Sequence, residues 1–138
     1  MIEWINIRLE EQRKLVDQLL SAPKFPFDDS LRSQLPDKPG LYAISVKNAP
    51  TGEFLRAGRT KGAAGGLRQR IYQNHLMGNQ HGNLRAQLVQ EGRCSDIEEA
   101  NRWIRENCRV QFLVIEDDQR RQWAEYFMLS LLRPNYCD

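Results

Sequence analysis

Two short runs of β-favouring residues, joined by a turn sequence, place the strongest constraint on the fold of this chain. Residues 41–46 (LYAISV) and 54–58 (FLRAG) each have the length and the composition of a strand. Asn48, Pro50 and Gly52, which lie between the two runs, are residue types that favour turns. The sequence therefore predicts a β-hairpin.

Most of the remaining chain has the apolar periodicity of helices. This periodicity predicts helices over residues 1–21, from residue 67 onward, over 83–90, over 96–107 and from 118 to 132. Continuous apolar character over residues 110–115 predicts a third strand that is buried on both faces. We therefore expect an α/β fold in which helices flank a small three-stranded sheet, mixed or antiparallel. The expected order is β-β-α-α-α-β-α, after an extra N-terminal helix.

Local signals mark the ends of the last two helices. Ser95 and, three residues later, Glu98 form the pattern of a capping box that begins the penultimate helix. Asp117 or Asp118 caps the final helix, and Pro134 ends it.

The N-terminal part of the chain reads differently from the rest. Residues 21–40 contain four prolines, which predicts a connecting arm without regular structure. We therefore separate an N-terminal helix and arm, residues 1–38, from a domain over residues 39–138, the two forming one compact unit. The amphipathic N-terminal helix either folds back on the domain or pairs two chains into a homodimer.

Composition indicates a soluble globular protein of the cytoplasm. The chain is 41% hydrophobic and 28% charged, and no apolar run approaches the length of a membrane span. Glu3 interrupts the apolar pattern at the N-terminus, so this segment does not resemble a signal peptide. Three cysteines without CxxC spacing favour reduced thiols over disulfides or a zinc site. We expect no membrane partner.

The charges are distributed unevenly, although the net charge is only +2. Between Glu53 and Glu91 there is no acidic residue, and the same window holds six Lys and Arg residues. The rest of the chain holds the other 14 cations and all 18 acidic residues, so its net charge is −4. A basic window of this kind indicates a polyanionic partner or a solvated basic surface.

Four short segments stand in a fixed order on the predicted elements. They are Gly40-Leu41-Tyr42 after Pro39, Arg56-Ala57-Gly58-Arg59-Thr60, Leu67-Arg68-Gln69-Arg70-Ile71, and Glu125 followed nine residues later by Pro134 and then Tyr136. In this order they resemble the motifs of the GIY-YIG nuclease family: Gly-Ile-Tyr, Tyr-Ile-Gly, a Leu-x-x-Arg helix, and a glutamate in an apolar helix. The resemblance spans residues 39–137 and implies the GIY-YIG fold.

The resemblance implies an endonuclease that hydrolyses the phosphodiester bonds of double-stranded DNA with one divalent metal, Mg²⁺ or Mn²⁺. Glu125 would be the metal ligand, a role that suits magnesium because this ion prefers oxygen ligands and keeps several waters. Arg70 would hold the phosphate and stabilise the charge that develops on it. Tyr42 would position or deprotonate the attacking water, assisted by the positive field of Arg56 and Arg59.

Further candidates come from the same basic window. His75 is a catalytic candidate, although it sits one position beyond the His or Tyr of many relatives, a position that Asn74 occupies here. Binding to the nucleic acid is expected of five cationic or aromatic residues: Arg56, Lys61, Arg68, Tyr72 and Arg85.

Two departures from the family pattern favour an alternative function. Arg56 stands where the family has a tyrosine that supports catalysis, and Cys137 stands where an asparagine often follows. Because arginine stays protonated at neutral pH, Arg56 cannot act as a base. The alternative is a weakened or inactive nucleic-acid-binding module. The site residues also have structural readings: Glu125 and Arg70 as ordinary helix residues, and Tyr42 as a core aromatic.

Overall fold

The computed structural model describes residues 2–47, 53–61, 66–77 and 84–137. The predicted turn residues Asn48, Pro50 and Gly52 lie outside these ranges, as do the side chains of residues 73–77 and 137. Among the described helices, none combines the length and the apolar character that crossing a membrane requires.

A single mixed sheet forms the centre of the protein. Its three long strands are the predicted ones, namely β2 (Gly40–Val46), β3 (Phe54–Arg59) and β4 (Cys108–Val114). Two-residue strands, β1 (Phe25–Pro26) and β5 (Tyr136–Cys137), extend it, so the described residues form five strands in the order β1-β4-β2-β3-β5. All pairings are antiparallel except β3 with β5. The mixed α/β class is confirmed. The three-stranded prediction misses both edge strands, because two residues carry no alternating pattern.

Helices occupy the predicted segments and one unpredicted position. They are α1 (Glu3–Ser21), α2 (Leu31–Gln34), η1 (Arg68–Met77), α3 (Leu84–Gln90), α4 (Ile97–Asn107) and α5 (Asp118–Leu132). η1 is a π-helix, whose hydrogen bonds join residues five apart rather than four.

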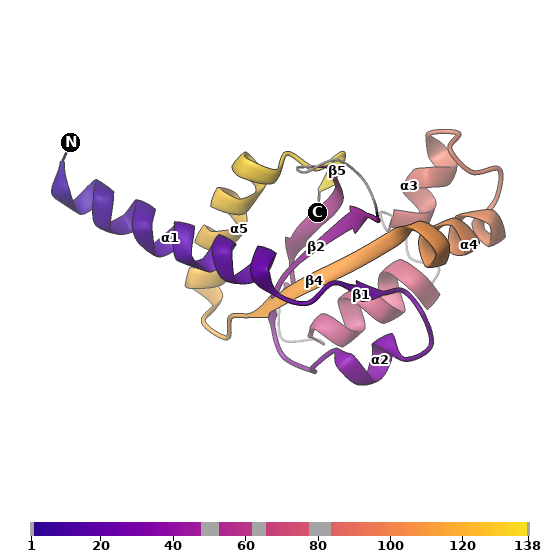
Figure 1. Ribbon diagram of the computed structural model, residues 1–138, viewed down its shortest axis with the longest axis horizontal. Coiled ribbons are helices and arrows are strands. Elements are labelled where there is room, and N and C mark those ends of the chain that lie inside the picture. Colours follow the sequence, from indigo (N-terminus) through magenta and orange to yellow (C-terminus); the bar gives the residue numbers. More distant parts are fainter. Residues whose placement is uncertain (1, 48–52, 62–65, 78–83, 138) are drawn as a thin grey trace.

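The helices divide between the two faces of the sheet (Figure 1). α1 and α5 cover one face, where Leu41 and Ala43 of β2 pack in a cluster with Met128 of α5. η1, α2, α3 and α4 lie toward the other face, where Tyr42 and Ile44 pack against them. β2 is therefore apolar on both sides, as a central strand between two layers requires.

The arm between α1 and β2 has more structure than the sequence predicts. It contains β1 and α2, and it buries Phe27, Leu31 and Leu35 in the cluster on the η1 face. The expectation of an arm without regular structure is therefore wrong. Phe27, Leu31 and Leu35 recur every fourth residue, which is the spacing of a helix face, but the four prolines of this segment outweigh that signal when only the sequence is considered.

The cap of α4 lies one residue later than expected. Asp96, not Ser95, is the N-cap, and its carboxylate accepts a hydrogen bond from the Glu99 amide at 2.8 Å. Glu99, not Glu98, reaches back and accepts from the Ser95 amide, also at 2.8 Å. Asp96 and Glu99 thus occupy the positions of a capping box, but Glu99 accepts from the amide of Ser95, the residue before the N-cap, rather than from that of Asp96. For α5, the expected cap is confirmed as Asp117.

Candidate functional site

The best-defined polar centre lies where β3 ends against α5. The Arg59 amide donates a hydrogen bond to Oε2 of Glu125 at 2.9 Å, and the Arg59 guanidinium donates to Oε1 at 3.0 Å. The side chains are only 18% and 5% exposed, so this is a nearly buried ion pair. Two residues 66 positions apart, which the motif comparison placed in one site, are therefore in direct contact.

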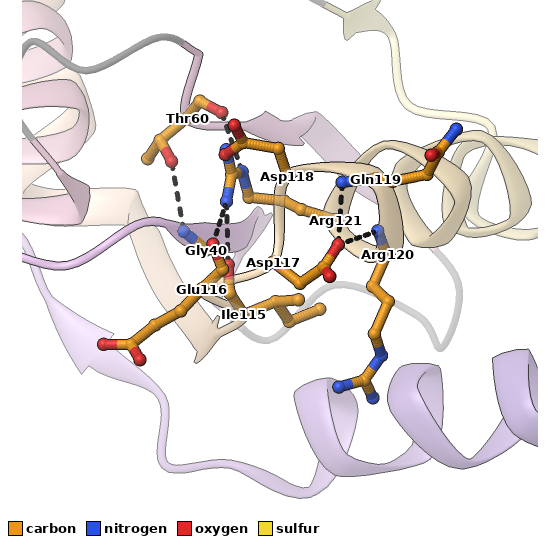
Figure 2. A network of polar contacts seen from close by, with 9 residues as sticks. All are labelled: Gly40, Thr60, Ile115, Glu116, Asp117, Asp118, Gln119, Arg120 and Arg121. Atoms are coloured by element: carbon orange, nitrogen blue, oxygen red, sulfur yellow. Dashed lines mark hydrogen bonds and ion pairs between the residues drawn. The ribbon is translucent and has the colours of Figure 1, made fainter.

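A second side chain of α5 fixes the same end of β3 (Figure 2). Arg121, one turn before Glu125, donates from Nε to the Thr60 carbonyl at 3.1 Å. Its Nη1 donates to the carbonyls of Ile115 at 2.9 Å and Glu116 at 3.2 Å. These bonds join the end of β3 to the loop before α5, and the guanidinium that makes them is buried.

The first motif lies next to this centre through the pairing of β2 with β3. The Gly40 amide donates to Oγ1 of Thr60 at 3.1 Å, and the Thr60 amide donates back to the Gly40 carbonyl at 3.0 Å. Only glycine fits at position 40, since a Cβ there would lie 2.2 Å from the Leu113 carbonyl oxygen. Two residues along β2, Tyr42 pairs with Gly58 and is fully buried. The backbone of Tyr42 is therefore one residue in register from the strand end that binds Glu125, whereas its side chain packs in the cluster on the η1 face and Glu125 comes from α5 on the other face.

The third motif lies on η1, which the arm anchors. The amide of Leu67, just before η1, donates to the Lys38 carbonyl at 2.9 Å, and the half-buried Arg70 is one turn further along. In a π-helix, residues five apart lie one turn apart. The backbone positions of Arg70 and His75 are thus about one turn apart. The His75 side chain lies outside the described residues.

Two predicted phosphate contacts are buried instead of presented at the surface. Arg56 is 2% exposed and its guanidinium donates to Oε1 of Gln87 on α3. Arg85 is 3% exposed, its Nη1 lies 3.4 Å from Oδ1 of Asn101, and burial lowers the pKa of Arg85 below its ordinary value. Helix packing therefore places both arginines inside the protein, and their predicted binding to nucleic acid stays a prediction.

The other predicted nucleic-acid contacts occupy three different environments. Lys61, two residues after the end of β3, is exposed. Arg68 pairs with Asp37 at 2.7 Å and donates to the Leu35 carbonyl at 3.0 Å, so it serves the arm. Tyr72 is half-buried against the η1-side cluster. Of the three, Lys61 remains a direct candidate for phosphate contact.

Sequence reasoning missed Arg121 and the part played by Thr60. Arg121 looks like a surface cation of an amphipathic helix, and it stands beside Arg120, which is exposed. One signal was present in the sequence: Arg121 precedes Glu125 by four residues, which places both on one face of α5.

The donor set at this centre fits a divalent metal held by a single protein carboxylate. Among the described residues, no three His, Cys, Asp or Glu side chains cluster as ligands of a closed metal site would. Magnesium commonly uses one or two carboxylates and completes its shell with waters and phosphate oxygens. The Glu125 carboxylate, which Arg59 orients, is a ligand of the type that such a metal uses.

Comparison of the chain with models of known protein families, with curated proteins and with solved structures finds no match in any of the three.

Proposed function

We propose that the protein is a divalent-metal-dependent DNA endonuclease of the GIY-YIG type, with its centre at the end of β3. The observation that supports this most strongly is the nearly buried Glu125 carboxylate, held by Arg59 beside the paired strand that carries Tyr42. Burying an ionised carboxylate is costly unless it is paired and hydrogen-bonded, and here both conditions are met by the residue that follows the second motif.

Arg59 has a second task in this proposal. Its backbone amide holds Oε2 of Glu125, whereas its guanidinium occupies Oε1. Glu125 would hold the metal and the Arg59 amide would keep its carboxylate oriented, while the Arg59 guanidinium, which now donates to Oε1, would bind a phosphate oxygen instead. The metal would neutralise phosphate charge and stabilise the leaving oxygen. Arg59 thereby exchanges one anion for another, a change that suits a planar, permanently charged group.

Tyr42 and Arg70 complete the proposed chemistry. Tyr42 positions or deprotonates the attacking water, and Arg70 binds the phosphate that is attacked. Because Tyr42 is fully buried, water reaches its hydroxyl only when the segments that cover it move on DNA binding. Lys61 is exposed and supplies a sequence-independent phosphate contact at the same strand end.

One observation favours a second candidate, a nucleic-acid-binding module without catalysis. Arg56, which replaces the family tyrosine, is buried and bonded to Gln87 rather than placed beside a water. A protein that keeps the scaffold but lacks this hydroxyl would bind DNA through Lys61 and other exposed cations. Its affinity would fall steeply with salt, because phosphate contacts release counterions.

Cleavage of supercoiled plasmid tests the first candidate. We expect nicking by the wild-type protein with Mg²⁺ or Mn²⁺, and none with EDTA. Glu125→Ala should lower the rate by at least ~100-fold, since it removes the proposed metal ligand. Glu98→Ala, which changes an exposed glutamate on α4, is the matched control and should cut normally. Salt-sensitive retardation of DNA by wild type and Glu125→Ala alike, without cleavage, would favour the binding module. If the wild-type protein neither cuts nor binds DNA, both candidate functions are rejected.

Arg56→Tyr separates the two candidates further. A gain in nicking would mean that the missing hydroxyl limits turnover in an otherwise working centre. An inactive variant that folds and still binds DNA would count against a nuclease weakened only at this position.

A further inference from the structure

The first half of α1 stands clear of the domain. Figure 1 shows this helix projecting from the body of the protein toward its N-terminal end. Its second half is fixed, with Val16 and Leu19 buried on the α5 side of the sheet. By contrast, Ile2, which directly precedes the helix, and Trp4 and Ile7 in its first half are 57%, 55% and 54% exposed. Helices with large apolar residues on more than one side are normally covered.

A groove runs beside this helix and is partly lined by it. The groove has a volume of about 1810 Å³ and lies among α1, α5 and the ends of β2, β3 and β4. Its apolar wall includes Ile7, Leu9, Phe127 and Leu131. A helix ~10 Å across fills about 120 Å³ per residue, so the groove has the volume of roughly fifteen helical residues. A helical segment is therefore an occupant of suitable size.

The charges around the groove decide the class of occupant. Five carboxylates line it, from Glu3, Glu10, Glu11, Asp17 and Glu53. Five cations also line it, from Arg13, Lys14, Lys24, Lys47 and Arg109. A balanced lining gives no net attraction for nucleic acid or an anionic membrane surface. It does suit a two-fold interface, in which one patch meets a copy of itself and must offer both signs.

We propose that the groove is the interface of a homodimer, in which the first half of α1 from each chain lies antiparallel in the groove of the other. The helix then fills the partner's groove with the apolar side chains that its own domain leaves exposed. A two-fold axis near residues 8 and 9 sets Glu3 of one chain beside Lys14 of the other, so the ends of the paired helices have opposite charge. This inference does not depend on the proposed nuclease activity.

Molar mass measured by sedimentation equilibrium tests the dimer. We expect twice the chain mass of 16.1 kDa at micromolar concentration. Ile7→Glu should weaken association by about a hundredfold or more, because a charge replaces an apolar contact at two places in a two-fold interface. Ile97→Glu changes an exposed isoleucine of α4 outside the groove lining and is the matched control. Circular dichroism should give the wild-type spectrum for both variants. A wild-type monomer at all concentrations overturns the proposal, and so does a dimer that Ile7→Glu leaves unchanged.

A cysteine near the expected two-fold axis tests the arrangement. Leu9→Cys should form an intermolecular disulfide under mild oxidation, and Glu106→Cys, at an exposed position on α4, should not. Equal cross-linking of both variants, or none for Leu9→Cys, overturns the antiparallel pairing. Monomeric protein that instead binds vesicles of anionic lipid through Trp4 would assign the helix to a membrane surface and overturn the dimer.

Discussion

The end of β3 and the first half of α1 depart from ordinary burial in opposite directions. At the end of β3, Arg59, Arg121 and Glu125 are charged and largely buried. On α1, large apolar side chains such as Trp4 and Ile7 are more than half exposed. The buried charges find their hydrogen-bond and ion-pair partners within the same chain. The exposed apolar side chains of α1 are left uncovered by their own chain and need another surface to bury them. The difference predicts which substitutions act on folding and which act on association.

The largest effect on stability is expected at Arg121. Replacing it with methionine keeps most of the apolar bulk but removes the bonds to the Thr60, Ile115 and Glu116 carbonyls. The free energy of unfolding should fall by ~3–5 kcal/mol, because buried acceptors lose charged donors. Arg120→Met, at the exposed neighbouring position, should stay within ~0.5 kcal/mol of wild type. Urea denaturation measures the stability of both variants. Equal midpoints would mean that the hydrogen bonds of Arg121 do not stabilise the end of β3.

Glu125→Gln should have the next largest effect. The amide retains an acceptor for the Arg59 backbone N–H but no longer balances the guanidinium charge. A loss of ~1.5–3 kcal/mol in unfolding free energy is expected, the range for hydrogen bonds to charged groups. Glu116→Gln, whose ion pair with Lys38 is mostly exposed, should change stability by less than ~1 kcal/mol. If the two variants are equally stable, the Arg59–Glu125 pair does not behave as a buried one.

Cys108 is a buried group that stays neutral, in contrast to the buried charged residues at the end of β3. Burial raises the pKa of the Cys108 thiol from an ordinary 9.0 to about 12. The folded state then holds the proton that the unfolded state loses, so this stability is complete below pH 9 and is lost as pH rises through 12. Between pH 8 and 10 the contribution should fall by ~1.4 kcal/mol. Urea unfolding of wild type and Cys108→Ala at both pH values checks this, and identical alkaline slopes would contradict it.

Sequence periodicity predicted the helices and strands better than it predicted which charged side chains are buried between them. The long strands and helices follow from apolar spacing, and Arg59 meets Glu125 as the order of motifs suggests. The burial of Arg56 and Arg85 did not follow, because a cation in a basic window looks exposed until α3 is packed over the sheet. Arg121 was missed for the same reason. Partners far apart in the chain decide whether a charge is buried, and periodicity records only neighbours.

Ile7→Glu should have the smallest effect on the folding of a single chain. Ile7 is 54% exposed, so within one chain its replacement should change the unfolding free energy by no more than ~0.5 kcal/mol. Association should instead make the stability of the wild-type protein depend on concentration, since a partner that binds only the folded state stabilises it by mass action. Thermal unfolding over a hundredfold range of protein concentration measures this. The wild-type midpoint should rise with concentration, whereas that of Ile7→Glu should stay constant and converge with wild type at high dilution. A gap that persists at high dilution would mean that Ile7 stabilises the single chain, and the contrast between the two regions would fail.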